Sequence, residues 1–386
     1  MHVLVINCGS SSIKYGLYEM PGQHQRARGI VDRVGSPLSL LRHHAGGQDL
    51  QRELHVDRIA TGVQVIADLL RHALADPTID AVGHRVVHGA DQFRHATVID
   101  DAVLDAIEQY ASLAPLHNPA NAEGIRAGRL HFQNATHVAV FDTAFFHTLD
   151  PKAYLYAVPK DWHQKYGIRR YGFHGTSHRY VSERAAAILN LDRPNLITMH
   201  LGNGCSMACV KEGLAIDTTM GFTPLEGLVM GTRSGDIDPG AILHLLDQGL
   251  APDEIRTGLQ HQGGLLGASG ISHDVRDLLS TQFVAASEAI SLFVHRVRKY
   301  LGSFLVQLER CDALVFTGGI GENAPALRAQ ICWRLDRFGI CLDDYANHRP
   351  NADERSVHAP DSSVRILVIP TNEELAIAKE TADLLR

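Results

Sequence analysis

The feature that most constrains this chain is a short apolar strand that runs directly into glycines. Residues 196–199 read Leu-Ile-Thr-Met and are mostly apolar, and residues 202–204 read Gly-Asn-Gly. Glycines at a strand end let backbone N–H groups approach an anion, because no Cβ blocks the way. A returning strand follows, and a polar loop then carries Arg233, Asp236 and Asp238. Backbone donors, a guanidinium and carboxylates in one segment are the combination that phosphoryl transfer requires.

A similar layout occurs at the start of the chain. Residues 3–6 predict a buried strand, residues 7–12 a polar tip, and residues 13–18 a returning strand. An ordinary hairpin also has a Gly/Ser tip, but Lys14 just beyond this one is able to reach a polyphosphate. We therefore expect an internal repeat of long period, with two related domains that face each other across a phosphate.

Length and composition restrict the kind of partner. The chain has 386 residues, enough for two domains, and a net charge of -7 with no long basic block. Nucleic acid and anionic membranes are therefore not expected partners, and a small molecule is. The six cysteines form no CxxC pair, and no apolar run is long enough for a signal segment or a membrane span. These observations predict a soluble, cytoplasmic protein without a disulfide framework.

Two charged residues lie in or just after predicted strands. Arg85 lies within the apolar run 81–87, so it needs an anionic ligand or a structural ion pair. Asp142 follows the strand 137–141, where α/β sheets place catalytic groups, although it is also suited to capping the next segment. His84 and His88 have the spacing of zinc ligands on a helix, but their segment is a predicted strand without the usual glutamate, so a metal site there is not expected.

Three further segments leave alternatives open. His174 beside Gly175 is either a helix cap or a donor to a ligand. A strand at 313–316, a glycine turn at 317–323 and a helix beginning near Pro325 are typical of nucleotide binding, although neither GxGxxG nor a Walker motif is present. Residues 371–374 match a capping box for the last helix, which gives Glu373 a structural alternative.

Ordered motifs along the whole chain resemble those of the acetate kinases, the acetokinase family. They are INCGSSSIK from residue 6, GHRVVHG from 83, PLHNP from 115, FDTAF from 141, YGFHGTSH from 171, HLGNG from 200, DTTMGFTPLEGL from 217, MGTRSGDIDP from 230, GIGEN from 319 and PTNEEL from 370. The resemblance implies an α/β fold with two ribonuclease-H-like domains, as in actin-like ATPases, facing each other across a nucleotide cleft. The implied domains are residues 1–145 plus 376–386, on the acetate side, and residues 146–375, which bind nucleotide.

The resemblance also implies reversible phosphoryl transfer from ATP to acetate, a Mg²⁺ requirement with Mn²⁺ as the alternative ion, and a homodimer. Asp142, His174 and Arg233 are the implied catalytic residues, and Asn7 and Glu373 would hold the metal, largely through water. The implied substrate-binding residues are Arg85, Val87, Leu116, His117, Phe173 and Pro224. The implied ATP-binding residues are Lys14, His200, Leu201, Gly202, Asn203, Gly204, Asp274, Val275, Arg276, Gly319, Ile320, Gly321, Glu322 and Asn323.

Some positions depart from the family pattern without removing a catalytic group. Ala90 and Gly318 stand where glycine and alanine are usual, and His273 stands where a small residue is common. Residues 146–151 also differ, which puts hinge behaviour between the domains in doubt.

Three alternative functions remain at this stage. They are a propionate or butyrate kinase, which differs in pocket volume, a non-kinase ATPase of the actin-like branch, and a metal-binding protein suggested by 23 dispersed histidines. An actin-like ATPase would not need Arg85 and Arg233 alongside His174. The sequence leaves open the physiological direction of the reaction and the preferred nucleotide. It also leaves open whether the phosphoryl group is transferred directly or through a phosphoenzyme, and we favour direct transfer.

Overall fold

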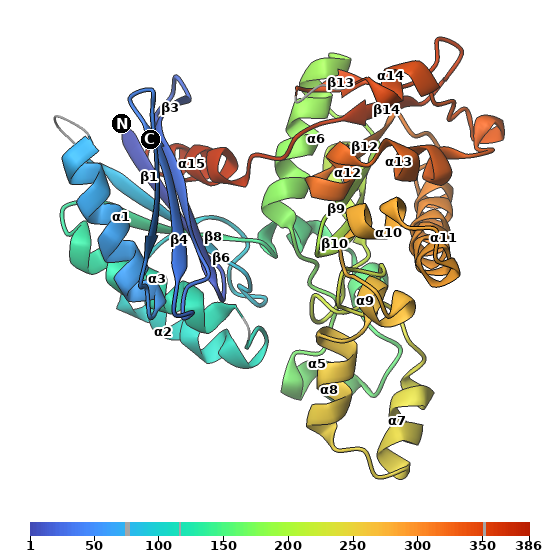
Figure 1. Ribbon diagram of the computed structural model, residues 1–386, viewed down its shortest axis with the longest axis horizontal. Coiled ribbons are helices and arrows are strands. Elements are labelled where there is room, and N and C mark those ends of the chain that lie inside the picture. The colour runs from blue at the N-terminus through green and yellow to red at the C-terminus, as the bar shows by residue number, and fades with distance from the viewer. Residues whose placement is uncertain (74–77, 116, 350–352) are drawn as a thin grey trace. The chain divides into compact units, whose positions relative to one another are not determined.

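The chain forms two compact units in the computed structural model, which describes residues 1–73, 78–115, 117–349 and 353–386. Unit 1 comprises Met1–His147 and Asn372–Arg386, and unit 2 comprises Thr148–Thr371. Each unit is built around its own sheet (Figure 1). Within the described ranges, no helix is both long and apolar enough to cross a membrane.

Unit 1 contains an eight-stranded sheet in the order β5-β4-β3-β2-β1-β6-β8-β7. Its strands are β1 (His2–Cys8), β2 (Ser12–Glu19), β3 (His24–Asp32), β4 (Ser39–Ala45), β5 (Gln48–Leu54), β6 (Ala81–Val86), β7 (Thr97–Val98) and β8 (Thr136–Phe141). From β1 to β5, each strand pairs antiparallel with the next one along the chain. Strands β1, β6 and β8 run parallel to one another. The helices are α1 (Ile59–Ala73), α2 (Asp101–Gln109), η1 (Tyr110–Ser112), α3 (Asn118–His131) and α15 (Glu373–Leu384), and η2 (Ala144–Thr148) lies at the unit boundary.

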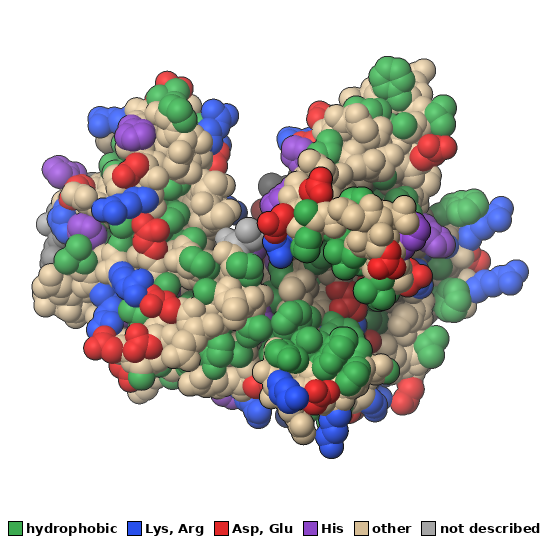
Figure 2. Space-filling model, turned by 90° about the horizontal axis from the view of Figure 1, so that it is seen from below, with side chains coloured by type: hydrophobic (Ala, Val, Ile, Leu, Met, Phe, Trp, Pro, Cys, Tyr) green, Lys and Arg blue, Asp and Glu red, His purple; other side chains and the backbone are tan. Residues whose placement is uncertain are grey.

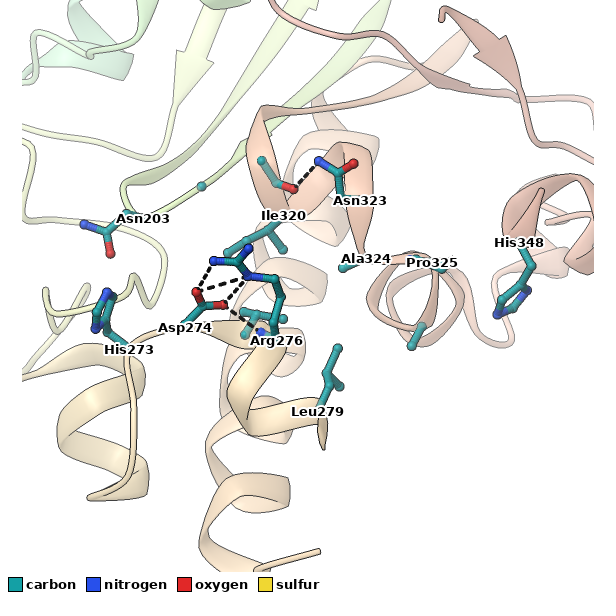
Figure 3. A pocket seen from close by; sticks show the side chains of 14 residues that line it. Asn203, His273, Asp274, Arg276, Leu279, Ile320, Asn323, Ala324, Pro325 and His348 are labelled. Carbon is teal, nitrogen blue, oxygen red and sulfur yellow. Dashed lines mark hydrogen bonds and ion pairs between the residues drawn. The ribbon is translucent and has the colours of Figure 1, made fainter. Parts of the chain in front are cut away.

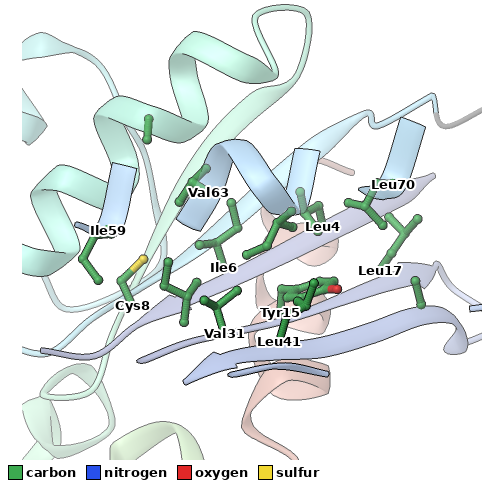
Figure 4. Packing of buried hydrophobic residues seen from close by; sticks show 14 of the residues in the cluster. Leu4, Ile6, Cys8, Tyr15, Leu17, Val31, Leu41, Ile59, Val63 and Leu70 are labelled. Carbon is green, nitrogen blue, oxygen red and sulfur yellow. The ribbon is translucent and has the colours of Figure 1, made fainter. Parts of the chain in front are cut away.

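Strand β1 is buried on both faces, which explains its unbroken apolar sequence. Leu4, Ile6 and Cys8 point into the cluster formed with α1 (Figure 4). Val3 and Val5 alternate with them and pack against α15 on the opposite face. Each fully buried aliphatic side chain of this kind contributes about 1.5–3 kcal/mol to stability. The end of β1, which carries Asn7, is therefore fixed by a two-sided core.

Unit 2 contains a six-stranded sheet in the order β11-β10-β9-β12-β14-β13. Its strands are β9 (Leu196–Leu201), β10 (Cys205–Lys211), β11 (Leu214–Thr218), β12 (Ala313–Thr317), β13 (Arg355–Ser356) and β14 (Arg365–Val368). Its helices are α4 (Pro151–Tyr154), α5 (Lys160–Tyr166), α6 (Gly175–Leu189), α7 (Pro239–Asp247), α8 (Pro252–Gln260), α9 (Gly264–Ser269), α10 (Val275–Ser280), α11 (Val284–Gln307), α12 (Gly318–Asn323), α13 (Pro325–Cys332), η3 (Asp336–Phe338) and α14 (Asp344–His348).

The two sheets share a five-stranded core with one topology. The order β3-β2-β1-β6-β8 in unit 1 corresponds to β11-β10-β9-β12-β14 in unit 2. In each core the first three strands of the chain are antiparallel, and the first, fourth and fifth are parallel. The predicted α/β class and long-period repeat are confirmed, and this strand order is the ribonuclease-H-like one that the resemblance implied.

Several local predictions need adjustment. The glycine turn expected at 317–323 is the short helix α12, which begins at Gly318 with φ of 76°. A Cβ added at Gly318 would lie 2.7 Å from the carbonyl oxygen of Leu201, so the usual alanine would not fit this backbone. The capping box at Thr371 is wrong, because Asn372 is the N-cap of α15 and accepts from the Leu375 N–H. The polar segment 21–57 contains β3, β4 and β5, of which β5 forms an edge of the sheet.

Charged side chains of both signs are interspersed on the face drawn in Figure 2. The net charge of -7 is thus not gathered into a single-sign patch on that face.

Candidate functional site

In unit 1, the carboxyl ends of β1, β6 and β8 bring together Asn7, Arg85 and Asp142. Arg85 Nη2 lies 2.6 Å from Asp142 Oδ2, and Nε lies 3.2 and 3.1 Å from the two carboxylate oxygens. Arg85 Nη1 donates to Asn7 Oδ1 at 3.3 Å. The structural ion pair considered for Arg85 is therefore present, and its partner is the predicted catalytic Asp142.

This ion pair leaves Arg85 able to bind a further anion. Its guanidinium has five N–H donors, of which Asp142 and Asn7 engage three. Burial alone would lower the pKa of Arg85, but the carboxylates of Asp142 and Glu373 outweigh burial and raise this pKa above its ordinary value. Arg85 remains charged, and two of its N–H groups have no hydrogen-bond partner among the described residues, which leaves them for a ligand carboxylate.

Lys14 and Glu373 are two further charged residues beside this group. Lys14 is directly opposite Asn7 in the β1–β2 pairing, so both side chains lie on one face of the sheet, and Lys14 is exposed. Glu373 is the first residue of α15 and interacts electrostatically with Arg85. Among the described residues, no group of three or more His, Cys, Asp and Glu side chains is arranged to hold a metal ion.

Two asparagines that the sequence interpretation did not single out position the end of β6. Asn121 accepts from the Val87 N–H at 3.0 Å and donates to the Cys8 carbonyl at 2.7 Å. Asn118 accepts from the His88 N–H at 3.1 Å and is fully buried. The only signal was their place in the PLHNPAN stretch that opens α3, whose N-cap is the predicted substrate residue His117. Val87 itself is buried, and the predicted Leu116 lies outside the described residues.

In unit 2, His174 and Arg233 lie beside the glycine turn after β9. A Cβ added at Gly204 would lie 3.4 Å from Arg233 Nη2 and 3.4 Å from His174 Nε2. His174 precedes α6 with φ of 57°, a left-handed conformation that costs a non-glycine residue of order 1–3 kcal/mol and is typical of functional positions. Its ring stacks on His200, with centroids 4.4 Å apart. The predicted Phe173 is buried next to it.

Arg233 is a cation without a carboxylate partner among the described residues. Its Nη1 donates to the Pro224 carbonyl at 2.7 Å, which links two predicted site residues. Burial lowers the pKa of the Arg233 guanidinium. A half-buried arginine beside bare backbone and lacking a counter-charge is a suitable anion site.

The two aspartates of the same loop serve the backbone instead. Asp236 accepts from the Gly227 N–H at 2.8 Å and from Tyr300 Oη at 2.8 Å, and it pairs with Arg296. Asp238 is the N-cap of α7 and accepts from the Gly240 N–H. The prediction that these carboxylates join the phosphoryl chemistry is therefore replaced by a structural role for both.

A second cluster fastens the part of the loop that precedes Gly227. Arg170 Nη2 donates to Glu226 Oε1 at 2.6 Å, and its Nη1 donates to the carbonyls of residues 218, 219 and 220. Tyr156 donates to the other Glu226 oxygen and accepts from the Phe222 N–H at 3.0 Å. Pro224 lies within this fastened stretch. The loop that carries Pro224 and Arg233 is thus held at both ends by Arg–carboxylate–Tyr clusters.

A cavity of about 730 Å³ lies wholly within unit 2, which is within the size range of small-molecule pockets. Eight predicted ATP-binding residues line it: Gly202, Asn203, Asp274, Val275, Arg276, Gly319, Ile320 and Asn323. His273, Leu279, Pro325 and His348 also line it and were not predicted. Figure 3 shows the Arg276 side chain against the Asp274 carboxylate, with Nη2 and Oδ2 2.5 Å apart.

Other predicted nucleotide residues lie elsewhere. His200, Leu201, Gly204, Gly321 and Glu322 are not among the described residues that line the cavity, and Lys14 belongs to unit 1. The Glu322 carboxylate instead accepts from the Gly318 N–H at 2.9 Å and from the Thr371 N–H at 3.2 Å. Glu322 therefore braces α12 against the segment after β14.

Comparison with known proteins gives matches over the whole chain. A profile described as the acetokinase family matches residues 2–379. Acetate kinases of Fervidobacterium nodosum and Thermotoga maritima are each 46% identical over 398 residues, covering 100% of this chain and 98% and 99% of theirs. The crystal structure of Porphyromonas gingivalis acetate kinase superposes with a TM-score of 0.92 at 41% identity and 100% coverage of both chains. A propionate kinase from Francisella tularensis gives a TM-score of 0.94 at 41% identity and 99% coverage of both chains.

Proposed function

The chain belongs to the acetokinase family, and from this membership we propose that it transfers the γ-phosphoryl group of ATP reversibly to acetate, giving acetyl phosphate and ADP. The observation that carries the proposal is the 46% identity to acetate kinases over 100% of the chain. The enzyme class is a phosphotransferase with a carboxyl group as acceptor.

The chemistry of this reaction explains why arginines are needed. Acetate is ionised at neutral pH, so no strong general base is required, and the main obstacle is repulsion between the carboxylate and the phosphoryl oxygens. In the proposed roles, the two remaining N–H groups of Arg85 bind the acetate carboxylate, while Arg233 and His174 contact the transferring phosphoryl group. Asp142 orients Arg85 through their bidentate ion pair. Transfer is proposed to be direct, because an acyl-phosphate on the enzyme would gain little when the acceptor is itself a carboxylate.

The metal residues of the proposal are Asn7 and Glu373. Their side chains supply the oxygen atoms that Mg²⁺ prefers, and two ligands are enough for an ion that keeps several waters and the nucleotide phosphates. Glu373 adds negative charge beside Arg85 in the same unit, which fits a cation-binding role. When bound, Mg²⁺, or Mn²⁺ in its place, would neutralise part of the phosphate charge.

Nucleotide binding is assigned to the cavity of unit 2. Val275, Leu279 and Ile320 give it an apolar wall suited to a base, and Arg276 and Asn323 supply polar groups. The turn at Gly202–Gly204 is proposed to approach the phosphates, and Lys14 of unit 1 is proposed to contact them as well.

The methyl group of acetate is assigned to Val87, Leu116, Phe173 and Pro224, with His117 as a nearby polar contact. A propionate kinase is the second candidate, since a protein of that name is 41% identical to this chain. One methylene in an apolar pocket changes the binding free energy by only about 1–3 kcal/mol, so activity with propionate is expected in either case.

The test is ATP formation from ADP, Mg²⁺ and acetyl phosphate, beside the forward reaction with acetate, propionate and butyrate. Rapid acetyl phosphate turnover and a falling series from acetate to butyrate is the expected result. A preference for propionate would change the substrate and keep the mechanism. ATP hydrolysis that is indifferent to every acid would overturn the proposal in favour of an actin-like ATPase.

A homodimer is also proposed, on the family resemblance alone, and a cytoplasmic location is proposed on the six scattered cysteines of the sequence. Analytical ultracentrifugation of the purified chain tests the first, and a single monomeric species at micromolar concentration would overturn it. Cell fractionation tests the second.

A further inference from the structure

Four polar side chains form a continuous hydrogen-bonded chain inside unit 2. Thr198 Oγ1 lies 2.7 Å from His178 Nδ1, and His178 Nε2 lies 2.8 Å from Ser206 Oγ. Ser206 Oγ lies 2.9 Å from His174 Nδ1. Thr198, His178 and Ser206 are all 0% exposed, so bulk solvent does not compete for these bonds. This series of hydrogen bonds, which we call the relay, therefore extends from Thr198 at the centre of β9 to His174, the residue that precedes α6.

In such a series, the direction of one hydrogen bond fixes the direction of all the others. Each hydroxyl carries one hydrogen, and a neutral imidazole has one N–H and one acceptor nitrogen. If Thr198 donates to His178 Nδ1, then His178 donates from Nε2 to Ser206, and Ser206 donates to His174 Nδ1. If Thr198 accepts instead, every bond reverses and His174 must carry its proton on Nδ1. Burial and the nearby His200 ring lower the pKa of His178 well below its ordinary value, so the neutral ring is the correct one to consider.

The Thr198 end decides between the two directions. Among the described residues, His178 Nδ1 is the only hydrogen-bond partner of the Thr198 hydroxyl. In the reversed direction this buried hydroxyl would have no acceptor for its hydrogen. Leaving one buried donor unsatisfied changes an equilibrium by roughly 5- to 150-fold. The direction in which Thr198 donates is therefore preferred by that factor.

We propose that Thr198, His178 and Ser206 are positioning residues that hold His174 in the neutral tautomer with its proton on Nε2. The Nε2 edge of the ring is the one that faces Gly204, since a Cβ there would lie 3.4 Å from Nε2. His174 then presents an N–H donor at the glycine turn. As a donor to the transferring phosphoryl group this rests on the proposed function, but the tautomer itself does not.

The relay also opposes protonation of His174 on Nδ1. Ser206 already directs its hydrogen at that nitrogen, and its oxygen already accepts from His178. A second proton on His174 would leave the Ser206 hydrogen without its acceptor. The arrangement thus supplies one directed N–H rather than a full positive charge beside Arg233.

The tautomer is measurable by nitrogen-15 NMR on the full-length protein labelled at histidine, with assignments from the variants His174→Gln and His178→Gln. The expected result is a single His174 tautomer with Nε2 protonated and Nδ1 bare, in the absence of any substrate. A His174 protonated on Nδ1 in the wild-type protein would overturn the proposal.

Removing the Thr198 hydroxyl should abolish the preference for one His174 tautomer. In Thr198→Val the tautomer ratio of His174 should fall from the roughly 5- to 150-fold preference towards 1, because the Thr198 hydroxyl no longer favours one direction. kcat should fall in proportion to the population lost, with KM for ATP unchanged. Thr198→Ser keeps the hydroxyl and should restore both. If Thr198→Val does not fold, Ser206→Ala gives the same loss of preference by breaking the middle link.

Thr218→Val is the matched control. Thr218 is 1% exposed in the same sheet, and its hydroxyl donates to the Met207 carbonyl at 2.8 Å, outside the relay. Its variant should lose stability without changing the His174 tautomer. The NMR result and the kinase assay fail separately: a protein without kinase activity but with the expected tautomer overturns only the proposed function. An active kinase whose tautomer is insensitive to Thr198→Val overturns only the relay.

Discussion

Arg85 and Asp142 form a bidentate ion pair in which Nη2 and Oδ2 are 2.6 Å apart and Nε contacts both carboxylate oxygens. The two side chains are 19% and 1% exposed. A predicted substrate-binding residue and a predicted catalytic residue are therefore joined in one ion pair. The orientation of the Arg85 donors that remain for acetate depends on Asp142.

Asp142→Asn should lower kcat by about 100-fold and raise KM for acetate, because a neutral amide no longer holds the guanidinium in one orientation. The variant should also lose about 1–3 kcal/mol in the free energy of unfolding, since a charge-assisted bond in a largely buried pair is removed. Steady-state kinetics and urea denaturation measure the two effects.

Asp68→Asn is the control for this change. Asp68 pairs with Arg71 on the same unit, but both side chains are 51% exposed, so the loss should stay below about 1 kcal/mol with normal kinetics. Near-normal activity in Asp142→Asn would reduce Asp142 to a structural residue.

Arg233→Ala should lower kcat by about 10² to 10³, the usual result of removing one preorganised donor to developing charge. Its stability should stay within about 1 kcal/mol of wild type, because the truncation leaves no carboxylate unpaired and removes a cation whose pKa burial lowers. Acetyl phosphate turnover and thermal denaturation test the two halves of this prediction.

Arg170→Ala supplies the contrast, because Arg170 lies outside this loop and holds it through Glu226. Arg170 is 15% exposed and pairs with Glu226, so its removal strands a carboxylate and should cost about 3 kcal/mol of stability. If Arg233→Ala were the less stable of the two variants, the interpretation of Arg233 as an uncompensated cation would be wrong.

The strand ends were predictable from local pattern. Asn7 and Asp142 directly follow predicted strands and Arg85 lies within one, and the structure brings the three residues together. An ion pair of Arg85 was among the alternatives, but its partner Asp142 was not predictable, since that contact depends on β6 and β8 being neighbours. Ala90 illustrates the same limit: its φ of 50° explains why glycine is usual there, and only the folded backbone reveals the angle.

The carboxylates were less predictable than the arginines. Asp236 and Glu322 are carboxylates in segments predicted to bind phosphate. Asp236 is hydrogen-bonded instead by Tyr300, 64 residues away, and Glu322 by the Thr371 N–H, 49 residues away. The role of each carboxylate depends on a partner that is distant in the sequence, and residue type alone does not identify that partner. The relay to His174 was missed for the same reason, because Thr198 reads as an ordinary strand residue.

Stability should fall as pH decreases below neutrality, because buried histidines stay neutral in the folded state. Burial and the adjacent His137 lower the pKa of His84 well below its ordinary value. The unfolded chain binds a proton at His84 below about pH 6.5 and the folded chain does not, so the stability present above that pH is lost as pH falls. One such group lowers the free energy of unfolding by about 2 kcal/mol between pH 6.5 and 5.

His84→Gln should reduce that loss by about the same 2 kcal/mol, measured by urea denaturation at pH 7 and pH 5. Glutamine retains an N–H for His137 Nδ1, which accepts because His137 Nε2 is engaged by the Phe132 carbonyl. His72→Gln, at an exposed position of α1, should leave the pH dependence unchanged. Equal slopes for wild type and His84→Gln would mean that His84 is not neutral in the folded state.

Arg276→Ala should raise KM for ATP and ADP by about tenfold and leave KM for acetate unchanged, because the cavity that Arg276 lines lies wholly in unit 2. Hydrogen bonds from Arg276 hold the pKa of Asp274 at about 2, so the pair stays charged and the effect should not vary between pH 6 and 8. Arg256→Ala is the control, since Arg256 pairs with Asp253 on α8 with side chains 61% and 87% exposed, away from the cavity lining. An unchanged KM for both nucleotides in Arg276→Ala, measured with saturating acetate or acetyl phosphate, would move the nucleotide out of this cavity.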